Sequence, residues 1–94
     1  MFKTIADVKR ANKEKGGEWF SRNTMKFFKS KIVSPLYGGA YFVTREQYDE
    51  NSKPRFTIRL ARKNGDIETH GQFMEYGNVD MAKDYAKEYA GKNY

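Results

Sequence analysis

The chain contains no cysteine and only one histidine in 94 residues. Without thiols it can form neither disulfides nor thiolate metal sites, and it has no cysteine nucleophile. It also lacks any run of about 18 apolar residues, which a membrane-spanning helix needs. Its first residues do not form the apolar core of a signal peptide. We therefore expect a soluble, cytoplasmic protein without a membrane partner.

The common catalytic motifs are missing as well: there is no G-x-S-x-G, no H-E-x-x-H and no glycine-rich phosphate loop. Asp66, Glu68 and His70 alternate along a predicted strand, so their side chains share a face and could gather a divalent metal. We favour the simpler interpretation, in which these acids are solvated and pair with Lys63 and its neighbours across a hairpin. We expect a protein that is not an enzyme, with no catalytic residue, cofactor or bound metal.

Positive charge is concentrated in the first third of the chain. Residues 1–31 hold nine Lys and Arg against three Asp and Glu, whereas residues 66–94 hold three Lys against six acids. This distribution favours a partner with an anionic surface, either nucleic acid or an acidic protein face. The side chains that we expect to carry the contact are Lys9, Arg10, Lys13, Lys26 and Lys29. Arg55 and Arg59 are expected to form a second contact on the outer face of a sheet, or alternatively to support the sheet through cross-strand contacts with Glu68 and Gln72.

Aromatic side chains lie among these cations at Trp19, Phe20, Phe27 and Phe28. Rings interleaved with cations are typical of proteins that bind single-stranded nucleic acids, where rings stack on bases. The alternative is that so short a chain needs these rings in its core. The sequence favours the core for the rings and leaves the lysines free to steer an anionic partner.

Local signals predict three helices. Thr4 and Asp7 form a capping-box pattern before a helix of residues 5–15, and two glycines end it. A short helix follows through Phe28, capped by Ser21 or Asn23. Asn78 caps a C-terminal helix that ends at Gly91 and carries an apolar stripe of Val79, Ala82, Tyr85, Ala86, Tyr89 and Ala90.

The segment between the helices alternates as strands do. Residues 40–44 form one predicted strand, and residues 56–60 form a hairpin with residues 67–76 through a type I′ turn at Asn64-Gly65. That turn sets Lys63 opposite Asp66, Phe56 opposite Phe73, Thr57 opposite Gln72 and Arg59 opposite His70. The face with Phe56, Ile58, Leu60 and Phe73 is expected to lie under the C-terminal helix, and the opposite face is expected to be solvated or to contact a partner.

These elements together predict one α+β domain over residues 1–94. We expect a three- to four-stranded antiparallel sheet with an N-terminal helix, a short second helix and a C-terminal helix packed on one face.

Several segments resemble a family of small uncharacterised proteins of bacteriophages and other mobile elements. The segments are residues 3–13, Trp19-Phe20-Ser21, residues 24–32, residues 39–44, residues 65–69 and Gly71-Gln72-Phe73. The resemblance covers nearly the whole chain and implies a setting, a bacterial cytoplasm, rather than a site.

That setting favours a small non-catalytic protein that inhibits a bacterial defence system, in the manner of an anti-CRISPR protein. Such an inhibitor would occupy a surface of a host nuclease, which is a protein or ribonucleoprotein, or bind its guide RNA. The alternative is an accessory protein of phage replication or transcription that binds DNA or RNA directly. The sequence does not indicate the oligomeric state.

Overall fold

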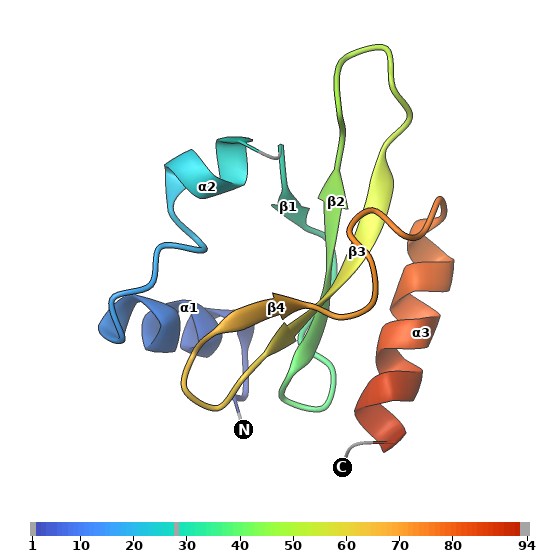
Figure 1. Cartoon of the computed structure of the whole chain (residues 1–94). Helices are drawn as coiled ribbons and strands as arrows, with labels where there is room; N and C mark the ends of the chain where they lie inside the picture. The colour runs from blue at the N-terminus through green and yellow to red at the C-terminus, as the bar shows by residue number, and fades with distance from the viewer. Residues whose placement is uncertain (1, 28, 93–94) are drawn as a thin grey trace.

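The computed structural model describes residues 2–27 and 29–92. It confirms the α+β fold class, with an antiparallel sheet, a helix at each end of the chain and a short helix between them (Figure 1). In chain order the elements are α1 (Ile5–Glu14), α2 (Arg22–Phe27), β1 (Lys31–Ile32), β2 (Tyr41–Glu46), β3 (Arg55–Ala61), β4 (Ile67–Thr69) and α3 (Val79–Lys92).

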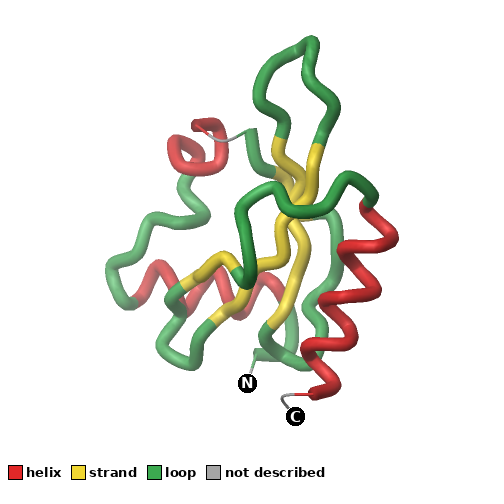
Figure 2. Tube along the Cα trace, turned by 45° about the vertical axis from the view of Figure 1, so that its right-hand side comes forward, coloured by secondary structure: helices red, strands yellow, loops and turns green. Residues whose placement is uncertain are grey.

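The four strands lie in the order β1-β2-β3-β4, each antiparallel to its neighbour. Helix α3 covers one face, as predicted, and α1 lies on the other side of the sheet (Figures 1 and 2). The core is accordingly divided in two by the sheet. Ala82, Ala86 and Ala90 of α3 pack against one face, and Val8 of α1 packs near Phe42 on the other. The small alanines allow α3 to approach the strands closely.

The predicted caps are present. The Thr4 hydroxyl accepts a hydrogen bond from the Asp7 amide, and the Asp7 carboxylate accepts one from the Thr4 amide. The Asn78 carboxamide oxygen accepts a hydrogen bond from the Met81 amide at 3.0 Å. Helix α1 ends at Glu14, one residue earlier than predicted, whereas α3 continues through Gly91 to Lys92.

The predicted turn type and register of the β3–β4 hairpin are wrong. Gly65 has a φ of +92°, but Asn64 does not have the positive φ that a type I′ turn requires. The Arg62 amide instead donates to the Asp66 carbonyl at 2.8 Å, which leaves a three-residue loop. Each pair is therefore shifted by one residue, and Arg59 lies opposite Thr69 rather than His70.

The shift grows beyond β4, where the chain loops out before it returns to β3. Phe56 pairs with Tyr76 rather than Phe73, and its amide donates to the Tyr76 carbonyl at 2.8 Å. Phe73 is therefore not on the face under α3 as predicted; it is 44% exposed and lies beside Arg59. The predicted pairing of Thr57 with Gln72 is also absent, because Thr57 receives a hydrogen bond from the Met74 amide through its hydroxyl.

The sheet face opposite α3 is not solvated as predicted. Thr44, Glu46 and Thr57 are fully buried there, and Arg59 is 6% exposed. The α1 helix and the segment that follows it cover this face, because Asn12 ties them to the hairpin. The Asn12 carboxamide donates to the Gly65 carbonyl at 2.9 Å and accepts from the Trp19 amide at 3.2 Å.

Within residues 2–27 and 29–92, every helix is too short or too polar to traverse a lipid bilayer.

Candidate functional site

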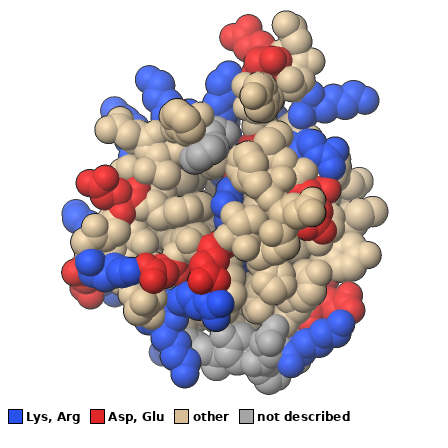
Figure 3. Space-filling view, viewed as in Figure 1, with Lys and Arg blue, Asp and Glu red and all other residues tan. Residues whose placement is uncertain are grey.

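A groove lined by cations lies between α2 and the adjacent edge of the sheet. It has a volume of about 770 Å³. We call it the basic groove; its lining residues are Arg22, Met25, Lys26, Lys29, Ser30, Lys31, Arg45 and Gln47. Five of these eight side chains are cations and none is acidic. Figure 3 shows basic side chains around α2 and the neighbouring end of β1.

Helix α2 supplies two of the cations from one face. Arg22 and Lys26 are four residues apart, so their side chains are neighbours on the helix surface. Ser21 starts the helix, since its hydroxyl accepts a hydrogen bond from the Thr24 amide at 3.2 Å. Like charges at this spacing destabilise a helix by a few tenths of a kcal/mol. The helix therefore carries a small cost for placing both charges at the groove.

Lys29 reverses the chain at the end of α2. Its φ is +50°, a left-handed conformation that usually belongs to glycine. The Ser30 amide donates to the Met25 carbonyl at 2.8 Å, and the Lys29 amide donates to the Lys26 carbonyl at 3.1 Å. This is the hydrogen-bond pattern of a Schellman helix end. A lysine in the position that favours glycine places a further cation on the groove.

The sheet edge supplies the remaining two cations as a direct cross-strand pair. Lys31 of β1 lies opposite Arg45 of β2 in the antiparallel register. Opposed side chains in such a pair have their Cβ atoms about 4.5–5.5 Å apart, and like charges there are destabilising. The Arg45 guanidinium also donates to the Gln47 carboxamide oxygen at 3.3 Å.

No acidic side chain within the described ranges forms an ion pair with these five cations. The ion pairs that are present lie elsewhere: Arg10–Asp7, Lys15–Asp66, Arg59–Glu46, Arg62–Glu68 and Lys92–Glu88. The pKa of Asp49 lies below its usual value mainly because Ser52 and Asn51 donate hydrogen bonds to its carboxylate. The positive charge of Lys29 lowers the same pKa by a smaller amount. The groove thus keeps a largely uncompensated positive charge.

Exposed rings lie beside the basic groove. A hollow of about 300 Å³ is lined by Phe27, Gln47, Tyr48, Phe73 and Met74, and we call it the aromatic hollow. Gln47 lines both this hollow and the basic groove. Phe27 is 79% exposed, Tyr48 82% and Phe73 44%. Burying a large ring is normally favourable, so three exposed rings around one hollow are an unusual feature of the surface.

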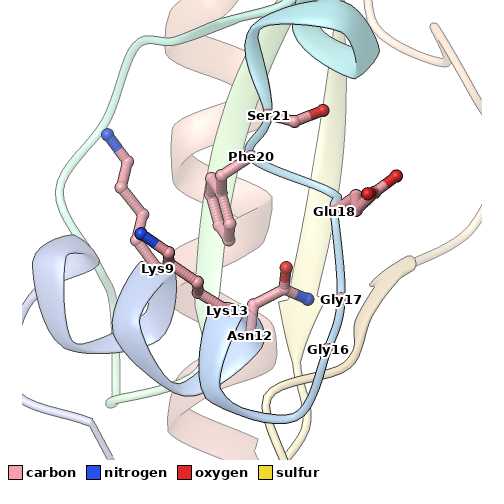
Figure 4. A pocket seen from close by; sticks show the side chains of 8 residues that line it. All are labelled: Lys9, Asn12, Lys13, Gly16, Gly17, Glu18, Phe20 and Ser21. Atoms are coloured by element: carbon pink, nitrogen blue, oxygen red, sulfur yellow. The ribbon is translucent and has the colours of Figure 1, made fainter.

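The structure divides the predicted contact residues between separate places. Lys26 and Lys29 lie at the basic groove, as described. Lys9 and Lys13 instead extend from α1 beside the Phe20 ring and line another pocket of about 580 Å³ (Figure 4). The Lys9 Nζ lies 5.9 Å from the centre of that ring. Arg10 is exposed and pairs with Asp7 at 3.4 Å.

The two arginines predicted on the outer sheet face have structural contacts. Arg55 is exposed, but its Nε donates to the Met74 carbonyl at 2.7 Å and its Nη2 to the Glu75 carbonyl at 2.8 Å. These bonds hold the segment that follows β4. The predicted exposure of Arg59 is wrong, because α1, α2 and the segment between them lie over this face. Its guanidinium therefore lies inside the molecule and not on the outer surface, where the second contact was predicted.

Arg59 is instead held inside the molecule by a buried polar network. Its Nη2 pairs with the Glu46 carboxylate at 3.2 Å, its Nε donates to the Thr44 hydroxyl at 3.0 Å, and its Nη1 donates to the Thr69 hydroxyl at 2.7 Å. Burial lowers the pKa of Arg59, and Glu46 acts in the opposite direction. Glu46 also accepts hydrogen bonds from the hydroxyls of Thr57 and Ser30.

The rings near the N-terminal cations do not share one role. Trp19 and Phe20 are half-buried and pack against Phe42 in the core on the α1 side, as the core interpretation predicts. Phe27 is exposed, which is the outcome that the binding interpretation predicts. Phe28 lies outside the described residues.

Asp66, Glu68 and His70 do not converge. Glu68 pairs with Arg62 at 2.9 Å across the hairpin, as predicted, whereas Asp66 pairs with Lys15 at the end of α1 rather than with Lys63 or its neighbours. The His70 ring packs 4.3 Å from the centre of the Tyr89 ring. In the part of the chain that the structure describes, no three His, Asp or Glu side chains form a group that could hold a metal ion.

Sequence reasoning missed Arg22, Lys31 and Arg45 as members of the groove. Arg22 and Lys31 entered only the charge total, and Arg45 lies beyond the predicted end of its strand. One signal was available for Arg22: it precedes Lys26 by four residues within a predicted helix.

Fold and site together define a small α+β protein with an uncompensated basic groove and an adjoining aromatic hollow. The chain belongs to the family of unknown function DUF7447, whose model matches residues 4–87. Comparison with curated proteins and with solved structures gives no match.

Proposed function

We propose that the protein binds single-stranded nucleic acid without catalysing a reaction. The basic groove would take the phosphate backbone, and the aromatic hollow would take unstacked bases. The observation that carries the proposal is the adjacency of five cations that form no ion pair with the described residues and three exposed rings, joined at Gln47.

The charge arrangement favours an anionic chain over a single small anion. The groove holds like charges at two places, along α2 and between Lys31 and Arg45. In water, two like charges repel by about 1 kcal/mol when they are 4 Å apart and by less at larger separations. Consecutive phosphates lying along the groove would relieve both repulsions and release the counterions that each phosphate carries.

The rings favour a single strand over a duplex. Bases in a duplex stack on one another, whereas a single strand can place its bases on protein rings, and each stacked base contributes about 1–3 kcal/mol. Phe27 and Tyr48 are nearly fully exposed, so a base can reach them without any rearrangement of the core.

The proposal is tested by fluorescence anisotropy with labelled single-stranded DNA and RNA over a range of salt concentrations. We expect affinity to fall with salt, with a slope of about −0.7 in log K per neutralised phosphate. The variant Lys31→Glu/Arg45→Glu should bind at least tenfold more weakly. The matched control is Lys83→Glu/Lys87→Glu, which makes the same charge change on α3 and should retain most of the affinity.

Absence of salt-sensitive binding would refute the proposal. An equal loss in the groove variant and in the α3 control would show that net charge, rather than the groove, is responsible.

Inhibition of a bacterial defence nuclease stays a prediction. The basic groove would suit this role too, because a guide RNA offers single-stranded phosphates and bases. The chain would then act in the bacterial cytoplasm on a ribonucleoprotein. A plasmid-interference assay tests this role: the chain should restore plasmid survival, and the Lys31→Glu/Arg45→Glu variant should not. Unchanged interference would contradict it.

A further inference from the structure

A fourth, smaller cavity lies between the basic groove and the aromatic hollow. It has a volume of about 230 Å³, below the roughly 300–1,000 Å³ of pockets for drug-sized ligands, so it suits a group the size of one base. We call it the Arg59 cavity; its lining residues are Trp19, Thr24, Met25, Ser30, Arg59, Thr69 and Phe73. It shares Met25 and Ser30 with the groove and Phe73 with the hollow.

Arg59 gives this cavity a fixed set of hydrogen-bond donors. A guanidinium carries five N–H groups. Hydrogen bonds to Thr44, Thr69 and Glu46 use one hydrogen from each of its three nitrogens. A second hydrogen remains on Nη1 and on Nη2. Arg59 lines the cavity and is only 6% exposed, so its guanidinium belongs to an interior wall rather than to an open surface.

The other polar groups of the cavity also favour an acceptor as ligand. The Thr69 hydroxyl accepts from Arg59, so its own hydrogen is available to donate. The Thr24 hydroxyl accepts from Ser21 at 3.0 Å and has a hydrogen available in the same way. The Ser30 hydroxyl donates to Glu46 and adds no free donor. Hydroxyl oxygens can also accept, but the guanidinium of Arg59 can only donate, so the fixed polarity of the cavity favours a ligand with acceptors.

Aromatic rings bound the same space. The Arg59 Cζ lies 5.2 Å from the centre of the Trp19 ring and 5.5 Å from that of Phe73. Apolar ring surfaces with a few fixed donors are suited to a flat ligand that carries acceptors on its edge.

We infer that the Arg59 cavity selects a guanine base from the bound strand. Guanine presents two adjacent acceptors, O6 and N7, which match arginine, and this is the commonest specific contact between arginine and a base. Adenine presents an amino donor beside its N7, and cytosine presents an amino donor at N4, so both would place a donor against the fixed donors of Arg59. Thymine presents one acceptor, O4, beside its methyl group, so it cannot pair with two N–H groups as guanine does. The inference rests on the proposed function, because the groove must first bring the strand to the cavity.

The experiment uses four labelled DNA nonamers that differ only at the central base, with cytosine at the other eight positions. Affinity is followed by anisotropy. Occupation of the cavity is followed by protein fluorescence, because Trp19 is the only tryptophan in the chain and lines the cavity. We expect the guanine nonamer to bind at least fivefold more tightly than the other three and to quench Trp19 most strongly.

Variants without the hydroxyl donors link this preference to the cavity. Thr24→Val and Thr69→Val should each reduce the preference for guanine and leave the affinity for the all-cytosine nonamer within about twofold. Ser52→Ala removes a hydroxyl outside the cavity and should change neither. Circular dichroism confirms folding, and two independent variants keep the test valid if one does not fold.

The outcomes separate the inference from the proposed function. Salt-sensitive binding with equal affinity for all four nonamers, or with preference for another base, overturns the guanine inference and leaves the proposed function intact. No binding of any nonamer overturns both. Preference for guanine without stronger quenching of Trp19 than the other nonamers give places recognition outside the cavity and also overturns the inference.

Discussion

Replacing Lys29 with glycine should make the protein more stable and weaken its binding to nucleic acid. Lys29 has a φ of +50° and ends α2 at the basic groove. A residue selected for stability alone at this position would be glycine, which adopts this conformation without a steric penalty. The two effects of Lys29→Gly therefore have opposite signs.

The magnitudes follow from the backbone and from the charge. The left-handed conformation costs a residue with a side chain about 1–2 kcal/mol. Glycine recovers that cost but loses about 0.5–1 kcal/mol through the greater freedom of its unfolded chain. We expect a net gain of about 0.5–1 kcal/mol in the free energy of unfolding. Loss of one phosphate contact should lower the salt slope on single strands by about 0.7.

Urea unfolding followed by circular dichroism measures the first effect, and anisotropy with a single-stranded oligonucleotide measures the second. Lys29→Ala is the matched control, because it removes the charge and keeps the backbone cost. It should weaken binding as much as Lys29→Gly with little gain in stability. If Lys29→Gly binds as tightly as the parent chain, the reasoning that places Lys29 in a functional groove is refuted.

Three further predictions concern the scaffold. Glu46→Gln should lower the free energy of unfolding by about 3–5 kcal/mol in urea titrations, since it leaves the buried charge of Arg59 unpaired; a loss below 1 kcal/mol would contradict the pairing. Gly65→Ala should cost on the order of 2–3 kcal/mol in the same assay, because the residue has a φ of +92° and an added Cβ would lie 2.7 Å from the carbonyl carbon of Ala11; an unchanged midpoint would argue against this packing. Burial raises the pKa of Tyr76 above its usual value, so the folded state keeps the phenol proton at a pH where the unfolded state loses it, and stability should fall as pH rises above about 10. Tyr76→Phe should make that fall less steep in urea titrations from pH 9 to 11.5. An equal slope in the variant and the parent chain would contradict the raised pKa.

Much of the fold follows from local sequence. The Thr4 and Asn78 caps start their helices where predicted, because cap and first turn are adjacent in the chain. The hairpin turn was mispredicted for a tertiary reason. Gly65 packs against the backbone of α1 and accepts a hydrogen bond from Asn12, and no local pattern reveals that contact.

The candidate site could be predicted only in part. The excess of cations in the first 31 residues indicates an anionic partner, and two of the predicted lysines lie in the groove. The pairing of Lys31 with Arg45 depends on strand register and could not be read from charge. The burial of Arg59 could not be predicted because its partner, Glu46, lies beyond the predicted end of the strand at residue 44. An exposed arginine was therefore expected where the structure has a buried ion pair.

The most direct test of the account is to map the contact surface by NMR, following backbone amide shifts as a single-stranded oligonucleotide is added. The account predicts that the largest shifts fall on α2, on Lys31 and Arg45, and on Tyr48. Shifts concentrated on α3, or no shifts at oligonucleotide concentrations well above that of the protein, would contradict it.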